Sequence, residues 1–134
     1  MEADTVNIAS GFYKNYLRKA DECFNSMNAS FANGDWNMAV IAAVHCAISC
    51  ADALTVKFLG IRHRGMRHEG VAKLLNQLKL EDIGKKNRQL LNLLSIKSAA
   101  EYEPRLMSQT EASEAVRDAE RFYKWAKEVL KEPG

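Results

Sequence analysis

Three polar side chains capable of acid–base and nucleophilic chemistry are spaced along one apolar segment. His45, Ser49 and Asp52 stand at positions i, i+4 and i+7, so a helix through them brings all three to the same side. In one interpretation they line a groove in which Asp52 pairs with a cation such as Lys97 and His45 exchanges protons near neutral pH. In the other they form a hydrogen-bonded seam that fixes the register of packed helices. A hydrolytic Ser–His–Asp triad is not expected, because one helix supplies all three residues, without a strained turn or evident oxyanion donors.

A glycine-punctuated segment carries most of the positive charge. Residues 57–73 contain five basic residues against one acidic residue, so their net charge is +4 in a chain whose total is +2. Such a segment could bind the phosphates of a nucleotide or RNA, and we assign that role to its three arginines, Arg62, Arg64 and Arg67. The alternative is a solvated loop neutralised by acidic residues of a neighbouring helix or subunit. No Phe, Trp or Tyr lies between Phe58 and Tyr102, so the segment offers no platform for stacking bases.

Metal sites, cofactors and disulfides are not expected. His63 and His68 are five residues apart, a spacing that does not place two imidazoles on one helical face. The cysteines, Cys23, Cys46 and Cys50, are odd in number and include no Cys-x-x-Cys pair, which argues against a disulfide framework or a zinc finger. We expect Cys46 and Cys50 to be buried, apolar thiols in a reducing compartment.

From the composition we expect a soluble chain, and we expect no targeting segment. Of its 134 residues, 47% are hydrophobic and 27% are charged, values typical of one globular domain. The N-terminus is acidic and lacks the basic and apolar regions of a secretory signal. The longest unbroken apolar run, residues 38–44, has seven residues, far fewer than the ~20 that cross a bilayer. We therefore expect a cytoplasmic protein that does not enter a membrane.

Five helices must position these side chains. Apolar residues recur at three- and four-residue intervals over about residues 10–32, 36–59, 71–78, 80–100 and 109–130, as they do in amphipathic helices. Asn33-Gly34 supplies a left-handed stop, and Asp35 can cap the next helix, so the first two helices should be antiparallel neighbours. The second helix is apolar nearly all round and should be the most buried.

The later helix boundaries have their own signals. Pro104 disfavours helical geometry before it and predicts a loop around residues 103–105. Ser108-x-x-Glu111 has the spacing of a capping box. We find no strand pattern, repeat or second domain. We therefore expect an all-α fold, an antiparallel four-to-five-helix up-and-down bundle, as a single domain over residues 1–134 with its ordered core at about 10–131.

Several segments resemble HEPN domains. The first two helices of that family resemble Tyr16-Leu-Arg-Lys-Ala20, Gly34-Asp-Trp-Asn-Met-Ala39 and Ala43-Val-His-Cys-Ala-Ile-Ser-Cys-Ala-Asp-Ala-Leu54. The order continues with His68 before a Val71/Leu74/Leu75 helix, then Leu94-Ser-Ile-Lys-Ser-Ala-Ala-Glu-Tyr102, and a final helix after Ser108. The resemblance covers about residues 13–130.

The resemblance implies a compact helical bundle, often a homodimer, from prokaryotic nucleotide- and RNA-related systems such as toxin–antitoxin pairs, frequently beside a small nucleotidyltransferase. Catalytic members are metal-independent ribonucleases that carry Arg, four to six residues, then His, brought together by two protomers. The matching stretch here reads Lys97-x-x-x-x-Tyr102. Lysine lacks the planar fork of arginine, and a phenol of pKa ~10 is a poor acid–base group at neutral pH.

These observations favour a non-catalytic HEPN-like module that dimerises and binds a nucleotide, RNA or a protein partner. Its groove would contain His45, Asp52, Lys97 and Tyr102 beside the basic segment. One alternative is a metal-independent RNA endonuclease, because Arg62 and His68 have the arginine-to-histidine spacing, although they follow the second helix, where the family motif is not expected. His68 would then be the general base on a ribose hydroxyl, and Arg62 or Arg64 would stabilise the phosphorane. Another alternative is a purely structural protein-interaction bundle.

Overall fold

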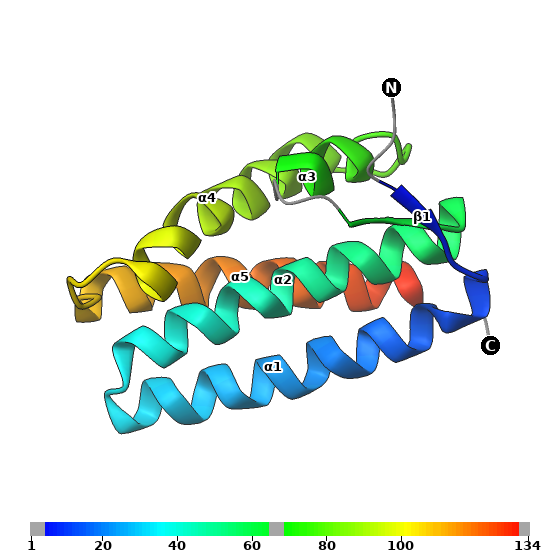
Figure 1. The fold of residues 1–134 in the computed structure, drawn as a ribbon. Coiled ribbons are helices and arrows are strands. Elements are labelled where there is room, and N and C mark those ends of the chain that lie inside the picture. The colour runs from blue at the N-terminus through cyan, green and yellow to red at the C-terminus, as the bar shows by residue number, and fades with distance from the viewer. Residues whose placement is uncertain (1–4, 65–68, 132–134) are drawn as a thin grey trace.

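A long apolar helix lies at the centre of the structure, a computed structural model that describes residues 5–64 and 69–131 (Figure 1). This helix, α2, packs against three long neighbours. The bounds of the four long helices are α1 (Tyr13–Asn33), α2 (Trp36–Leu59), α4 (Ile83–Tyr102) and α5 (Gln109–Leu130). The chain reverses direction between α1 and α2 and between α4 and α5, so the predicted all-α, up-and-down bundle is confirmed.

Small residues let the neighbouring helices approach α2 closely. An alanine recurs at every fourth residue along α2, and all four of these residues are fully buried: Ala39, Ala43, Ala47 and Ala51. Interaxial distances between helices depend on the side chains at the contact, so a stripe of alanines permits close packing. Larger side chains from α5 and α1, among them Phe122 and Met27, are also fully buried and fill the remaining core.

The hydropathy of α2 reflects this central position. By length and composition α2 could cross a membrane, but 78% of its most apolar 18-residue window is buried inside the bundle. A helix that is hydrophobic all round is typical of the core of a helical protein as well as of a bilayer. Packing therefore identifies α2 as the core helix that its sequence predicts.

The turn between α1 and α2 has the predicted left-handed stop. Gly34 has φ +78°, its N–H donates to the Phe31 carbonyl, and the Asp35 N–H donates to the Ser30 carbonyl. This pair of bonds satisfies carbonyls at the end of α1. The predicted cap by Asp35 is wrong, however: Asp35 occupies the N-cap position of α2 but its side chain makes no capping hydrogen bond.

The remaining helices differ from prediction mainly at their ends. The short helix α3 spans Glu69–Leu75, and α4 begins at Ile83 instead of residue 80. Asp82, at the N-cap of α4, has φ +66°, a left-handed conformation that a helix cannot include. At the other end, α4 stops at Tyr102 and Glu103 is extended, as expected for a residue that precedes a proline.

The prediction that the chain has no strands is wrong. Strand β1 (Thr5–Asn7) pairs antiparallel with β2 (Ile61–His63), and the short 3₁₀ helix η1 (Ser10–Phe12) follows. Gly60 ends α2 with φ +69°, and its carbonyl accepts a hydrogen bond from the Ile8 N–H next to the sheet. Three-residue strands are too short to show an alternating pattern. The sheet ties the N-terminal segment to the start of the basic segment.

The capping box at the start of α5 is confirmed. The Ser108 hydroxyl accepts from the Glu111 N–H at 3.0 Å, and the Glu111 carboxylate accepts from the Ser108 N–H at 2.9 Å. We expect Ser108→Ala to lower the free energy of unfolding by about 1 kcal/mol, as measured by urea denaturation. Ser113→Ala is the matched control, because this exposed serine lies one turn into the same helix. Equal effects of the two variants would contradict the assignment.

Candidate functional site

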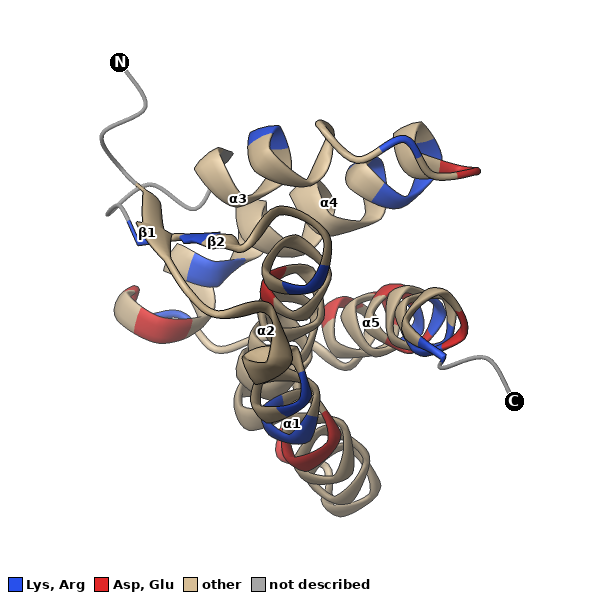
Figure 2. Cartoon of the chain, turned by 90° about the vertical axis from the view of Figure 1, so that its right-hand side faces the viewer, with Lys and Arg blue, Asp and Glu red and all other residues tan. Residues whose placement is uncertain are grey.

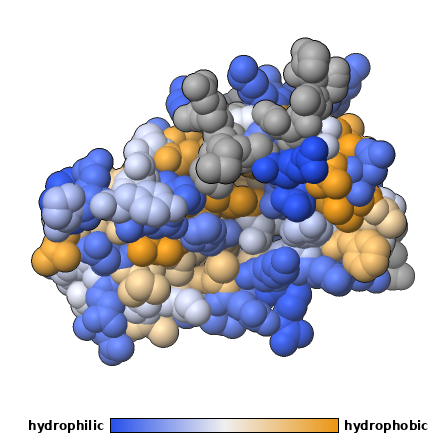
Figure 3. Space-filling model, in the orientation of Figure 1, coloured by the Kyte–Doolittle hydropathy of each residue, from blue (hydrophilic) through white to orange (hydrophobic). Residues whose placement is uncertain are grey.

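In Figure 1 α2 lies between α1 and α4, and we call the face of α2 formed by the partly exposed Ile41, His45, Ile48 and Ser49 the exposed strip. His45 and Ser49 are half-buried on this strip, and Asp52 is buried further along the helix. Figure 3 shows this face of the molecule, with apolar surface (orange) among hydrophilic residues in the region between α4 and α1. The strip is therefore the part of α2 that α1, α4 and α5 leave accessible.

Glu101 joins two of the predicted site residues. Its carboxylate accepts a hydrogen bond from His45 Nε2 at 2.8 Å and from Lys97 Nζ at 2.7 Å. The side chains of Lys97 and Glu101 are only 12% and 14% exposed. Burial raises the pKa of Glu101, but the hydrogen bonds from Lys97 and His45 outweigh it, so its pKa lies below the usual value. This cluster links α2 to α4.

The predicted pairing of Asp52 with Lys97 is therefore wrong, because Glu101 binds Lys97. Tyr102 belongs to the same end of α4: its ring centroid lies 5.6 Å from Lys97 Nζ, and the residue is 76% exposed. Sequence reasoning missed Glu101, although its spacing of four residues from Lys97 is a signal for an ion pair on one helical face.

Asp52 has a different electrostatic environment. It is 9% exposed, and burial raises the pKa of its carboxyl to about 7, although the charges of Arg62 and Lys19 act to lower it. Within the described part of the chain, no group donates a hydrogen bond to this carboxylate. Asp52 therefore changes its charge near neutral pH inside the bundle.

Arg62 is directed into the protein rather than to solvent. It lies in β2, its Nη1 donates to the His63 carbonyl at 3.0 Å, and its Nε is buried without an acceptor among the described residues. Lys57, earlier in the basic segment, donates to the Leu130 carbonyl at 3.1 Å. Backbone carbonyl groups of the protein therefore accept hydrogen bonds from both cations.

The rest of the basic segment divides between exposed and undescribed residues. Arg64 and Lys73 are exposed, whereas Arg67 and His68 lie outside the described residues. Figure 2, which looks along the bundle, shows positive charge on β2, whereas α1 and α5 carry both signs. Among the described arginines of the segment, Arg64 is the one whose side chain is accessible to a phosphate.

A surface hollow of about 430 Å³ lies between α1 and α2. It is lined by Lys19, Glu22, Cys23, Ser26, Ala42, His45 and Ser49, and we call it the α1–α2 hollow. Sequence reasoning identified His45 and Ser49 but missed the contribution of α1. The four residues from α1 have helical spacing in the sequence: Lys19, Glu22, Cys23 and Ser26. Only the pairing of the two helices shows that they face His45 and Ser49.

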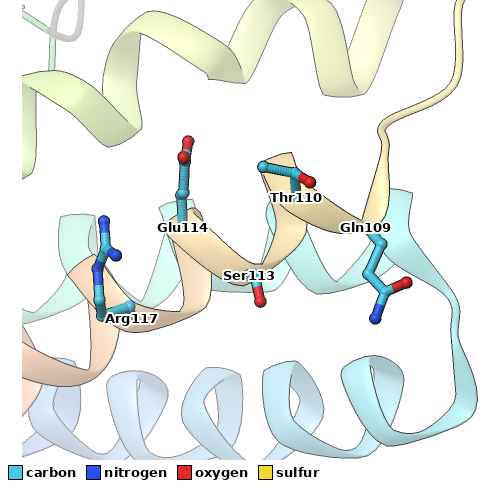
Figure 4. A pocket seen from close by; sticks show the side chains of 5 residues that line it. All are labelled: Gln109, Thr110, Ser113, Glu114 and Arg117. Atoms are coloured by element: carbon cyan, nitrogen blue, oxygen red, sulfur yellow. The ribbon is translucent and has the colours of Figure 1, made fainter.

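A second hollow, of about 470 Å³, runs along the start of α5. Figure 4 shows its lining residues, Gln109, Thr110, Ser113, Glu114 and Arg117. All five come from one helix. In Figure 4 Thr110, Glu114 and Arg117 point to one side of α5, and Gln109 and Ser113 point to the other. These side chains do not converge, so this hollow is not our candidate site.

The cysteines belong to the interior. Cys46 and Cys50 are fully buried, as predicted, and Cys23 is half-buried. In the described ranges, no three His, Cys, Asp or Glu side chains lie close enough together to hold a metal ion.

Comparison with models of protein families identifies a domain that covers most of the chain. A model of the HEPN domain family matches residues 13–129, a range that runs from the start of α1 almost to the end of α5. No curated protein matches the chain.

Proposed function

Because the chain belongs to the HEPN domain family, we propose that it is a non-catalytic HEPN module, which forms a homodimer and binds a nucleotide or RNA beside the exposed strip of α2. The observation that carries this proposal is the environment of Lys97, which Glu101 neutralises in a largely buried ion pair. A cation held in this way cannot reach out to stabilise a developing phosphorane charge. The positions that would hold arginine and histidine in a catalytic member hold Lys97 and Tyr102.

The same geometry weighs against the endonuclease alternative. Of its two proposed electrostatic groups, Arg62 donates to the His63 carbonyl and its charge acts on Asp52, whereas Arg64 is exposed. Its proposed base, His68, lies outside the described residues. Binding therefore has more support than cleavage, with Arg64 as an accessible phosphate ligand. We place the protein in the cytoplasm as a single domain.

We expect single-stranded RNA or a nucleotide to bind with an affinity that falls as salt rises. Each phosphate contact releases condensed counterions, so the logarithm of the affinity should fall by ~0.7 per contact for each tenfold increase in salt. Fluorescence anisotropy of a labelled RNA oligonucleotide at several salt concentrations measures this slope. An affinity that does not change with salt would contradict phosphate binding.

The dimer proposal rests on apolar side chains at one end of the exposed strip. Asn37 ties the start of α2 to α4 through the Ala100 carbonyl and to the loop before α5 through the Met107 N–H. Leu106 and Tyr102, beside this junction, are 79% and 76% exposed. Apolar and aromatic side chains of this kind are common in the buried core of protein interfaces. A nucleotidyltransferase or another protein is the alternative occupant.

We expect the wild-type protein to have twice its chain mass of 15.1 kDa in gel filtration with light scattering. Leu106→Glu should shift it towards the monomer, because a charge at the centre of an apolar interface costs free energy on association. Leu59→Glu is the control, since this partly exposed leucine lies at the opposite end of α2. A monomeric wild type at micromolar concentration would contradict the dimer.

A further inference from the structure

We propose that the α1–α2 hollow is a phosphoryl-binding site, formed by Lys19 and Ser26 from α1 with His45 and Ser49 from α2. This inference rests on the proposed nucleotide or RNA binding and gives it a location. The site differs from the predicted one, because neither the basic segment nor Lys97 contributes to it.

The hollow gathers hydrogen-bond donors from two antiparallel helices. Ser26 and Ser49 contribute hydroxyls, and Lys19 contributes an ammonium group with three donors. The Lys19 charge also acts on Asp52, one turn of α2 beyond Ser49. Ala42, in the wall, is too small to fill the space. A phosphoryl group, with several oxygens that each accept hydrogen bonds, suits donors arriving from two walls.

Lys19 has no salt-bridge partner among the described residues, although its charge acts on the buried Asp52. Glu22, the carboxylate in the wall, accepts a hydrogen bond from Arg18 Nε at 3.1 Å, so its charge is already paired. Within residues 5–64 and 69–131 Lys19 forms no salt bridge; its Nζ lies 5.3 Å from the centroid of the Tyr16 ring. An accessible ammonium beside a neutralised carboxylate favours an anion.

His45 forms the α4 side of the site. Its Nε2 is held by Glu101, so the ring has a fixed orientation and its Nδ1 is not used in that bond. Lys97 neutralises Glu101 in turn. The carboxylate that holds the imidazole therefore adds no unpaired negative charge beside the hollow. The hollow is open to solvent and has a volume of about 430 Å³, which leaves room for a phosphoryl group.

The test is titration of ¹⁵N-labelled full-length protein with inorganic phosphate, adenosine monophosphate or a short single-stranded RNA, followed by NMR. We expect the largest shift changes at amides around Lys19, Ser26, His45 and Ser49. Lys19→Ala should weaken binding about tenfold, the loss typical of one charge-assisted hydrogen bond, and Ser49→Ala severalfold. Lys124→Ala is the matched control, because it removes the same charge from an exposed site on α5 and should leave the affinity unchanged.

The outcomes separate this inference from the proposed function. If RNA or nucleotide binds but Lys19→Ala and Ser49→Ala bind as tightly as the wild type, the hollow is not the site, although the proposed function stands. If the wild type binds none of the three probes, the proposed function fails as well. Binding of phosphate or the mononucleotide identifies a terminal phosphoryl ligand, whereas Lys19-dependent binding of RNA alone identifies a backbone phosphodiester. Since Lys19 is exposed, loss of binding with an unchanged circular dichroism spectrum cannot be attributed to misfolding.

Discussion

Glu101→Gln is expected to lower the free energy of unfolding by about 3 kcal/mol. The substitution removes the negative charge that compensates Lys97, whose side chain is only 12% exposed. An uncompensated charge in such a position is costly, because few water molecules can solvate it. Urea denaturation at pH 7 measures the loss.

Two further variants test the cause of that loss. Glu103→Gln removes a charge two residues away, where the side chain is half exposed and lies 3.9 Å from Arg105, and should cost less than about 1 kcal/mol. The double variant Lys97→Met with Glu101→Leu replaces the ion pair by apolar side chains and should recover most of the stability. If Glu101→Gln costs no more than Glu103→Gln, the pair does not behave as a buried ion pair.

Asp52→Asn is expected to stabilise the protein at alkaline pH. In the folded protein burial raises the pKa of Asp52 to about 7, whereas in the unfolded chain it is near ~4. Between these values the folded state binds more protons than the unfolded state, so the stability contributed by this group falls as pH rises. Asparagine has the shape of the protonated acid and does not ionise.

The advantage of Asp52→Asn over the wild type should therefore grow by roughly 3 kcal/mol between pH 5 and pH 8.5. Urea denaturation across this pH range measures it. Asp35→Asn, at an exposed position where asparagine is an equally good N-cap residue, should leave the pH dependence unchanged. A constant difference between Asp52→Asn and the wild type would show that Asp52 titrates normally.

Much of the fold was predictable because local signals decide it. The largely apolar composition of α2, the glycine at position 34 and the Ser108/Glu111 spacing each act within one or two turns of helix, and the structure confirms each. The strands escaped prediction because β1 and β2 are stabilised by pairing between residues more than fifty positions apart. Asp35 failed as a cap although its residue type suits the position, since its φ of −84° and ψ of 75° lie outside the extended conformation usual for an N-cap residue.

The candidate site was predictable only in part, for the same reason. His45 and Lys97 do share one cluster, but Glu101 connects them, and Asp52 lies near Arg62 and Lys19 instead. Periodicity assigns a residue to a face of its own helix, but it does not say which face of another helix lies opposite. Lys19 and Ser26 could not be identified for this reason until α1 was placed against α2.

The central claim, a HEPN module that binds RNA or a nucleotide without cleaving it, is tested most directly by incubating purified wild-type protein with labelled single-stranded RNA in excess chelator. Anisotropy records binding, and a denaturing gel of the same samples records the length of the RNA. We expect saturable binding that weakens with salt and RNA that stays at full length. Cleavage that disappears in His68→Ala would contradict it, as would the absence of binding to both RNA and nucleotide at low salt.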